Sequence, residues 1–258
     1  FTNALGKTWQ SAYDAAGRQR RTVDPLSNIS TFMFDKADQQ VAYQNPLGKR
    51  WSTIYDSDGL PIASVNPLGF RASTIYDAAH QRMVIYGGYD GSGCLGEVWA
   101  LALGSQPTWT QLSPTGASPT ARYAHSAIYD AAHERMVVFG GYDGSGYLGD
   151  VWTLSLAGAP AWTQWAPSGP APGVRAHHGA ILDPVRDRMV VFGGGYYDGS
   201  LWHDYNDVST LSMAGTPMWE GLTPAGIPPG GRLAHSAVYD PKRDCMVKPS
   251  CLPPRPMT

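Results

Sequence analysis

The chain has 258 residues and a formal net charge of −2, and only 16% of its residues are charged. A charge this small, without a cluster of lysines and arginines, excludes the electrostatic pattern of a nucleic-acid-binding protein, so we expect no nucleic-acid partner. No apolar run approaches the roughly 18 residues of a membrane span. The 30 glycines and 21 prolines argue against long helices and favour repeated strands and turns.

The N-terminal part repeats with a step of 21 residues, and each unit contains an aromatic residue followed by aspartate. The four pairs are Tyr13-Asp14, Phe34-Asp35, Tyr55-Asp56 and Tyr76-Asp77. After the first pair, Asp14 and Gly17 supply the acceptor side chain and the positive φ that a tight reversal needs. Asn45-Pro46 marks a second kind of reversal, because proline fixes φ. Each unit therefore predicts a hairpin, and successive hairpins predict a spiral.

From Tyr76 the step lengthens to 53 residues. Three units begin with Arg-Met-Val, starting at Arg82, Arg135 and Arg188, and each reaches two glycines that begin five residues after the arginine. In the middle unit, four strand-like runs cover residues 124–129, 136–139, 150–156 and 162–165. We expect the second run to be buried on both faces and to end at the paired glycines. Four antiparallel strands per unit predict one small twisted sheet.

The 21-residue units resemble the YD (Rhs) repeats of large bacterial surface and toxin proteins. The resemblance rests on the Tyr-Asp pairs, on Gly17-Arg18 and on the closing Asn-Pro-Leu-Gly segments; Ser27 departs from it, where glycine is usual. It covers residues 1–75 and implies a β-hairpin array that serves as a scaffold within a larger bacterial polypeptide. It also implies an extracellular or cell-surface location.

The 53-residue units resemble kelch repeats, whose period is about 50 residues. The paired glycines, the Asp-Val-Trp type of third strand and the tryptophan of the fourth strand carry this resemblance. It implies an all-β fold, namely a partial kelch-type β-propeller of four-stranded blades over residues 76–247. Three blades are complete and a fourth begins. Residues 248–258 predict an irregular proline-rich tail that does not finish the blade, so we expect an open arc.

An arginine and a histidine recur at the start of the first strand of each unit. In kelch relatives these positions lie near the central axis, where loops commonly bind ligands. They are candidate binding residues, because arginine offers a planar fork and histidine one donor and one acceptor. The alternative is structural, with each histidine capping a link and each arginine pairing with a neighbouring turn. The candidates are Arg122, His125, Arg175, His178, Arg232 and His235.

The third unit contains an insertion, because Met136 and Met189 are 53 residues apart whereas Met189 and Met246 are 57 apart. Aromatic residues collect where the repeat is broken, and exposed aromatics serve both sugar and protein contacts. A tolerated loop insertion is the alternative. The candidate recognition residues are Tyr196, Tyr197, Trp202, His203 and Tyr205.

The sequence predicts no catalytic set, no metal site and no cofactor. The loops that begin at Asp90, Asp143 and Asp198 lack the further acidic ligands of a calcium cage, so we expect ordinary Asp-Gly turns. The cysteines match no zinc spacing, and unpaired thiols or a Cys245–Cys251 disulfide both fit their positions.

We therefore expect a non-catalytic repeat scaffold or binding module, part of a larger bacterial surface or secreted protein, with a protein or glycan partner. The alternative is a fragment of a secreted galactose-oxidase-like carbohydrate-active enzyme. That family needs copper with a Tyr, His and cross-linked Cys set, which we do not locate in this sequence. A composite chain without an independent function is a third possibility.

Overall fold

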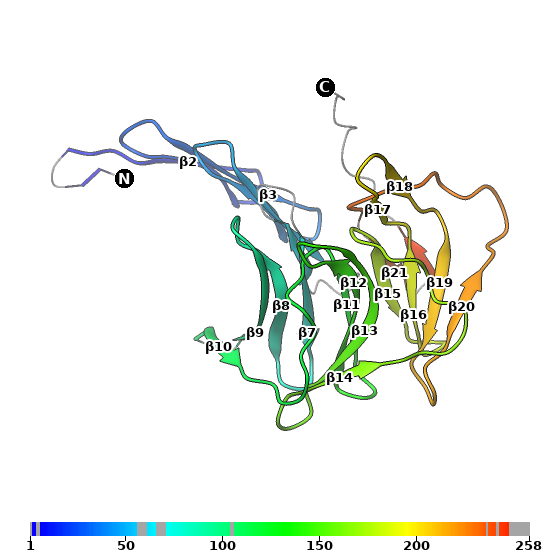
Figure 1. Ribbon diagram of the computed structural model, residues 1–258. Coiled ribbons are helices and arrows are strands. Elements are labelled where there is room, and N and C mark those ends of the chain that lie inside the picture. The colour runs from blue at the N-terminus through cyan, green and yellow to red at the C-terminus, as the bar shows by residue number, and fades with distance from the viewer. Residues whose placement is uncertain are drawn as a thin grey trace.

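The computed structural model describes residues 2–3, 6–55, 61–65, 71–103, 106–235, 237–240 and 243–247. Every element in these ranges is a β-strand, which confirms the all-β prediction. No helix in the described ranges is long and apolar enough to span a membrane. The predicted irregular tail, residues 248–258, lies outside the described residues. Figure 1 shows the strands as an arc of upright sheets with an extended sheet at the N-terminal end.

One continuous antiparallel sheet contains the first ten strands, and each strand pairs with the next in the chain. The 21-residue units therefore form a meander of consecutive hairpins, and the expected spiral stays a prediction. The sheet continues from the 21-residue units into the first 53-residue unit, because β6 pairs with β7. Its strands are β1 (Gln10–Tyr13), β2 (Gln19–Val23), β3 (Ile29–Phe34), β4 (Gln40–Gln44), β5 (Arg50–Tyr55), β6 (Pro61–Val65), β7 (Arg71–Asp77), β8 (Arg82–Tyr89), β9 (Cys94–Ala102) and β10 (Thr108–Leu112).

The turns explain why a meander forms. Asp14 Oδ1 accepts the backbone N–H groups of Ala16 and Arg18 at 3.0 Å each, and the turn ends at Gly17 with φ +78°. The proline-containing turn has the same design, because Asn45 Oδ1 accepts the N–H groups of Leu47 and Lys49 at 3.0 and 2.9 Å. Both kinds of reversal are equally tight, so consecutive strands lie edge to edge.

The remaining strands confirm the predicted blades. We call β7–β10 blade 1. Blade 2 contains β11 (Ser126–Asp130), β12 (Arg135–Tyr142), β13 (Tyr147–Ser155) and β14 (Ala161–Trp165), and blade 3 contains β15 (Gly179–Asp183), β16 (Arg188–Phe192), β19 (Val208–Ser212) and β20 (Trp219–Leu222). Both are four-stranded antiparallel sheets. Blade 4 begins with β21 (Val238–Asp240) and β22 (Cys245–Val247).

The paired glycines do not end the second strand in blades 1 and 2, contrary to the prediction. There β12 continues to Tyr142 through a bulge at Gly140, where the register with β13 shifts. In blade 3 the prediction holds, since β16 ends at Phe192. The insertion then forms its own hairpin, β17 (Gly195–Tyr197) and β18 (Trp202–Asp204).

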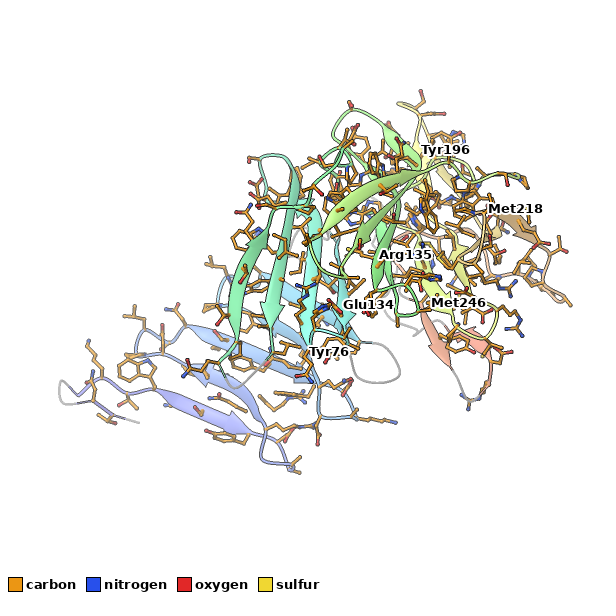
Figure 2. The ribbon with its side chains drawn as sticks, turned by 90° about the horizontal axis from the view of Figure 1, so that it is seen from below. Tyr76, Glu134, Arg135, Tyr196, Met218 and Met246 are labelled. Atoms are coloured by element: carbon orange, nitrogen blue, oxygen red, sulfur yellow. The ribbon has the colours of Figure 1, made fainter. Side chains whose placement is uncertain are left out.

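The cores lie between successive blades, and Figure 2 shows the side chains along the arc. Tyr86 of blade 1 is fully buried against Trp162 of blade 2, with the ring centroids 4.9 Å apart. Phe139 of blade 2 meets Trp219 of blade 3 at the same distance. Burying one such side chain contributes roughly 1.5–3 kcal/mol, so each blade depends on its neighbour.

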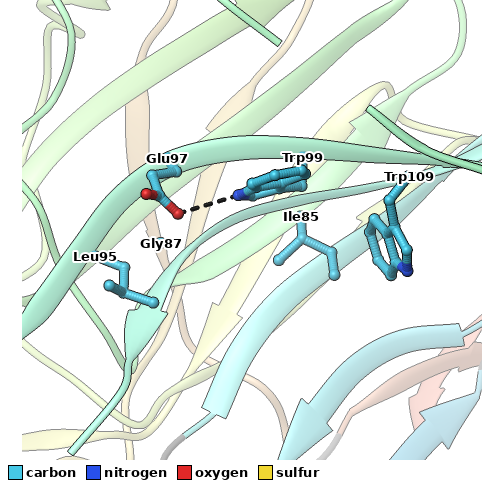
Figure 3. Close-up of a pocket in the computed structure, with 6 residues that line it drawn as sticks. All are labelled: Ile85, Gly87, Leu95, Glu97, Trp99 and Trp109. Atoms are coloured by element: carbon cyan, nitrogen blue, oxygen red, sulfur yellow. Dashed lines mark hydrogen bonds between the residues drawn. The ribbon is translucent and has the colours of Figure 1, made fainter. Parts of the chain in front are cut away.

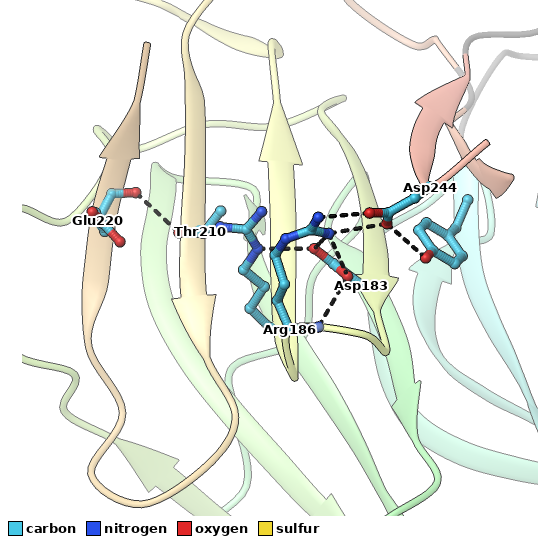
Figure 4. Close-up of polar contacts among 7 residues, drawn as sticks. Asp183, Arg186, Thr210, Glu220 and Asp244 are labelled. Atoms are coloured by element: carbon cyan, nitrogen blue, oxygen red, sulfur yellow. Dashed lines mark hydrogen bonds and ion pairs between the residues drawn. The ribbon is translucent and has the colours of Figure 1, made fainter. Parts of the chain in front are cut away.

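Polar contacts fasten the turns between the first two strands of each blade. Asp77 accepts Arg82 Nε at 2.8 Å within blade 1 and the Tyr129 hydroxyl of blade 2 at 2.9 Å. Figure 4 shows the corresponding connection farther along the arc: Arg186 of blade 3 reaches Asp183 in its own turn and both carboxylate oxygens of Asp244 in blade 4. These contacts join blades whose described strands do not pair with each other.

Candidate functional site

Two of the recurring arginines, Arg122 and Arg175, are buried and bonded within their own blades. Arg122 is 0% exposed, and its guanidinium donates to both carboxylate oxygens of Asp150 at 2.6 and 2.9 Å and to the Gly140 carbonyl at 3.0 Å. Arg175 repeats this arrangement with Asp207, at 2.8 Å to each oxygen. The guanidiniums join the link before each blade to its third strand.

The recurring histidines lie between blades. Their rings pack on the aromatic residue that precedes the paired glycines in the preceding blade. The pairs are Tyr86 with His125, Phe139 with His178 and Phe192 with His235, at centroid distances of 5.3, 5.1 and 5.3 Å. His125 and His178 are each 1% exposed, and His235 is 8% exposed. Arg232 is half-buried and donates to the Gly230 carbonyl at 2.9 Å. The proposed role of these arginines and histidines in ligand binding stays a prediction. The contacts that the structure shows for them are contacts within the chain.

The residue before each of these histidines adopts a left-handed backbone. Ala124, His177 and Ala234 have φ values of +55°, +58° and +53°. His177 N–H donates to the Ala124 carbonyl, and Ala234 N–H donates to the His177 carbonyl, both at 2.8 Å. A series of backbone hydrogen bonds thus connects the segments that precede blades 2, 3 and 4. The sequence did not reveal it, because alanine rarely occupies this region.

The insertion forms an ordered hairpin. Tyr196 and His203 face each other across β17 and β18, with their rings stacked 4.6 Å apart at an interplanar angle of 13°. His203 Nε2 lies 2.6 Å from Asp198 Oδ2. This hydrogen bond, helped by the N–H groups of Leu201 and Ser200, lowers the pKa of Asp198 to about 2.

The insertion extends a row of aromatic rings from the other blades. Tyr147 lies 6.2 Å from both Tyr196 and Trp202, and Tyr142 lies 4.9 Å from Tyr147. Tyr123 then contacts Tyr142 and Tyr89 at 5.7 and 5.3 Å. We call the following set the aromatic face: Tyr89, Tyr123, Tyr142, Tyr147, Tyr196, Tyr197, Trp202 and His203.

Sequence reasoning found half of this face and missed Tyr89, Tyr123, Tyr142 and Tyr147. The available signal was positional, since Tyr89 and Tyr142 directly follow the paired glycines. Tyr205, the remaining candidate from the insertion, is half-buried with the Arg175 guanidinium 4.2 Å from its ring centroid. Its ring centroid also lies 6.0 Å from that of Tyr196 in the hairpin.

The loops that begin at Asp90, Asp143 and Asp198 are held by hydrogen bonds to these aspartates. Asp90 Oδ1 accepts the N–H groups of Ser92 and Gly93 at 2.7 and 2.9 Å, which are the contacts of an Asp-Gly turn. Burial raises the pKa of Tyr123 and of Tyr147, so both hydroxyls stay protonated at neutral pH. Within the part of the chain that the structure describes, no three His, Cys, Asp or Glu side chains are grouped to hold a metal.

Two of the cysteines are described, Cys94 and Cys245, and neither forms a disulfide with another described residue. Cys251 lies outside the described residues, so the alternative of a Cys245–Cys251 disulfide stays a prediction.

Comparison with known proteins matches residues 38–247 to the family model described as the KLHDC2/KLHL20/DRC7 Kelch-repeats domain. A leucine-zipper-like transcriptional regulator 1 homolog of Drosophila melanogaster is 30% identical over 56% of this chain and 14% of its own length. Putative adagio-like protein 2 of Oryza sativa is 34% identical over 62% of this chain and 27% of its own. Serine/threonine-protein phosphatase BSL2 of Arabidopsis thaliana is 29% identical over 61% and 15%.

These relatives correct the expected location. The extracellular or cell-surface assignment rested on the likeness of residues 1–75 to a bacterial repeat, and it is wrong. The relatives come from eukaryotes and are named as a transcriptional regulator, an adagio-like protein and a protein phosphatase. The family match also begins at residue 38, inside the segment that resembles YD repeats.

Proposed function

The chain belongs to the kelch-repeat family, and we propose that it binds a protein partner through the aromatic face. Kelch repeats form non-catalytic interaction modules in general, and the relatives support a role as a protein-interaction scaffold. The chain covers less than a third of each of these relatives, so the proposal concerns the blades alone.

The observation that carries the proposal is the unbroken row of rings across three blades. Tyrosine and tryptophan bury a large area with few rotatable bonds and are the residues that most often dominate protein interfaces. Trp202 is 45% exposed and Tyr197 is 42% exposed, so apolar surface remains for a partner to cover. Aromatic hydroxyls and the His203 ring add hydrogen-bonding groups to that surface.

The loops need little ordering before they bind. The hydroxyls of Tyr89, Tyr142 and Tyr197 each donate to the carbonyl of the glycine two residues later, at 3.3, 3.0 and 3.0 Å. Together with the aspartate-capped turns, these bonds hold the loops in one conformation. A surface that is ordered in advance loses less entropy on association and binds more tightly.

The experiment is a peptide-display selection on the full chain, followed by affinity measurements on aromatic-face variants. Trp202→Ala and Tyr147→Ala should each weaken the selected peptide by roughly tenfold or more. Trp109→Ala is the matched control, because Trp109 is similarly exposed, at 49%, but lies on blade 1 outside the face. The proposal would be overturned if the selected peptides bound both aromatic-face variants as tightly as the unsubstituted chain. It would also be overturned if a glycan array showed binding and the peptide selection showed none.

The galactose-oxidase-like alternative gains no support. None of the relatives named above is named as an oxidase. The phosphatase relative does not change this, because the aligned region is only 15% of that protein.

A further inference from the structure

In blades 1 and 2, the loop between the second and third strands begins with a tyrosine of the aromatic face and an aspartate. The two pairs are Tyr89-Asp90 and Tyr142-Asp143. The loops, residues 88–97 and 141–150, contain no lysine and no arginine. A ring and a carboxyl group are thus neighbours in the sequence at both places, and neither loop supplies a cation to neutralise the carboxyl group.

Both aspartates are ionised at neutral pH. A hydrogen bond from the Ser145 backbone N–H is the main cause that holds the pKa of Asp143 below its ordinary value, and the Ser92 N–H acts in the same way on the pKa of Asp90. Asp143 Oδ1 accepts the Ser145 N–H and the Ser145 hydroxyl at 2.8 Å each. Among the described residues, the hydrogen bonds that the two aspartates accept all end at Oδ1, so Oδ2 of each is left for a partner.

The other carboxylates of these two loops are bonded within the chain. At the end of the blade-1 loop, Glu97 Oε2 accepts Trp99 Nε1–H at 3.0 Å, as Figure 3 shows. At the end of the blade-2 loop, both oxygens of Asp150 accept the Arg122 guanidinium. The negative charge that the loops present to a partner is therefore that of the two aspartates that follow the tyrosines.

The Tyr142-Asp143 pair lies inside the arc, with rings of the aromatic face on both sides of it. The Tyr142 ring lies 5.7 Å from Tyr123, which contacts Tyr89 of blade 1. On the other side it lies 4.9 Å from Tyr147, whose ring contacts the blade-3 insertion. A partner that covers this pair therefore meets rings from all three blades.

The chain itself shows which cation suits a ring beside a carboxylate. The Arg175 guanidinium lies 4.2 Å from the Tyr205 ring centroid and donates to both oxygens of Asp207 at 2.8 Å. A planar guanidinium can stack on an aromatic ring and still direct its N–H groups at a carboxylate. An ammonium group cannot stack in this way, so arginine complements the Tyr-Asp pairs better than lysine does.

We propose that the aromatic face binds an arginine-bearing segment of a partner protein, with a guanidinium placed on the Tyr142 ring and bonded to Asp143 Oδ2. This inference rests on the proposed function and adds the chemistry of the partner to it. The Tyr89-Asp90 pair offers a second place of the same kind. A segment with two arginines therefore complements the face better than a segment with one.

The probe is the peptide acetyl-Gly-Arg-Gly-Arg-Gly-amide, and its dissociation constant on the full chain is measured from the backbone amide resonance of Ser145. Asp143→Asn keeps Oδ1 as the acceptor of the turn and removes the charge. It should weaken binding by roughly tenfold or more, the loss expected for a charged hydrogen bond. On the unsubstituted chain, the same peptide with citrulline in place of arginine should be weakened similarly, and the lysine peptide should bind more weakly than the arginine peptide.

Glu220→Gln is the matched control, because it removes one negative charge from an exposed side chain on β20, outside the aromatic face. It should leave the affinity for the peptide unchanged. The inference would be overturned by equal affinities for Asp143→Asn and the unsubstituted chain, by equal affinities for the arginine and citrulline peptides, or by the absence of a Ser145 shift at millimolar peptide.

The display selection separates failure of this inference from failure of the proposed function. Selected peptides that lack arginine, lose affinity in Tyr147→Ala and keep it in Asp143→Asn would overturn the arginine chemistry and leave the proposed function standing. Selected peptides that bind Tyr147→Ala and Trp202→Ala as tightly as the unsubstituted chain would overturn the proposed function itself. Sedimentation velocity tests the occupant: self-association that Asp143→Asn abolishes would assign the face to a second copy of this chain and overturn the partner protein.

Discussion

Arg122 and Asp150 form a two-pronged ion pair within blade 2, with nitrogen–oxygen distances of 2.6 and 2.9 Å and no exposed surface on the arginine. Removing one partner of a buried pair leaves an uncompensated charge, so Arg122→Ala should lower the free energy of unfolding by about 3–5 kcal/mol. Urea denaturation measures this loss. Arg20→Ala is the control, because Arg20 is partly exposed and lies 3.8 Å from Asp14; its effect should stay below about 0.5 kcal/mol. A loss under about 1 kcal/mol for Arg122→Ala would contradict the assigned role.

The same pair predicts loss of stability in acid. Burial raises the pKa of Asp150, but the hydrogen bonds and charge of Arg122 outweigh burial, and the pKa lies below its ordinary value. A carboxyl with a depressed folded-state pKa stabilises the protein above its unfolded-state pKa of about 3.9, and that contribution disappears as the pH falls through the folded-state value. The melting temperature should therefore drop below about pH 4, and the acid-dependent drop should be smaller in Asp150→Asn. Equal slopes for the two proteins would refute the linkage.

Gly140 should tolerate no side chain. Its φ is +64°, and an added Cβ would lie 2.7 Å from the Arg175 carbonyl and 3.1 Å from the His178 ring. Gly158 has a similar φ of +72° with nothing within 4 Å of an added Cβ. Gly158→Ala should cost about 1 kcal/mol for the backbone conformation alone. Gly140→Ala should cost about 3 kcal/mol or more, because a backbone carbonyl must move. Chemical denaturation of both variants checks the difference, and equal costs would show that the contact is unimportant.

The two equivalent tryptophans should differ in their contribution to stability. Trp162→Ala removes a ring from the core between blades 1 and 2 and should cost about 3–5 kcal/mol. Trp109→Ala removes a half-exposed ring and should cost less than about 1 kcal/mol. Thermal melts of the two variants make the comparison. A large loss at Trp109 would mean that the open face of blade 1 is covered in solution.

The hydrogen bond between His203 and Asp198 can be tested through the pKa of the Asp198 carboxyl. The hydrogen bond from His203 is the main cause of the low pKa of Asp198, about 2. In His203→Ala the pKa should rise toward the ordinary value of about 3.9. Carbon-detected NMR of the aspartate carboxyls measures it directly. If the pKa is unchanged, the backbone N–H groups of the turn alone account for the shift.

The strands of the 53-residue units were predictable because their causes are local. Alternating apolar residues, the Asp-Gly turns and the glycines beside Phe139 all lie within one unit and repeat in the next. The turn chemistry of Asp14 and Asn45 was equally visible. The periodicity does not specify which strands pair with each other. The pairing of β6 with β7 and the resulting meander depend on the geometry of a whole sheet.

The candidate site was predicted only in part for the same reason. The insertion was visible as a broken repeat, but the contact between Tyr123 and Tyr142 joins a link to the end of a strand and leaves no pattern in the spacing. The arginines were recognised as a set, whereas their partners, Asp150 and Asp207, lie 28 and 32 residues farther along the chain. Only folded coordinates show that these recurring charges neutralise each other.

The hydrogen bonds between β6 and β7 have a mechanical consequence. A strand ladder, rather than a flexible tether, joins the two periodicities, since Ala63 pairs with Ser73 and Val65 with Arg71. The N-terminal strands are therefore a stiff arm whose orientation is fixed by the blade it extends. Anything attached to that arm would be connected to the blades through consecutive strand pairs.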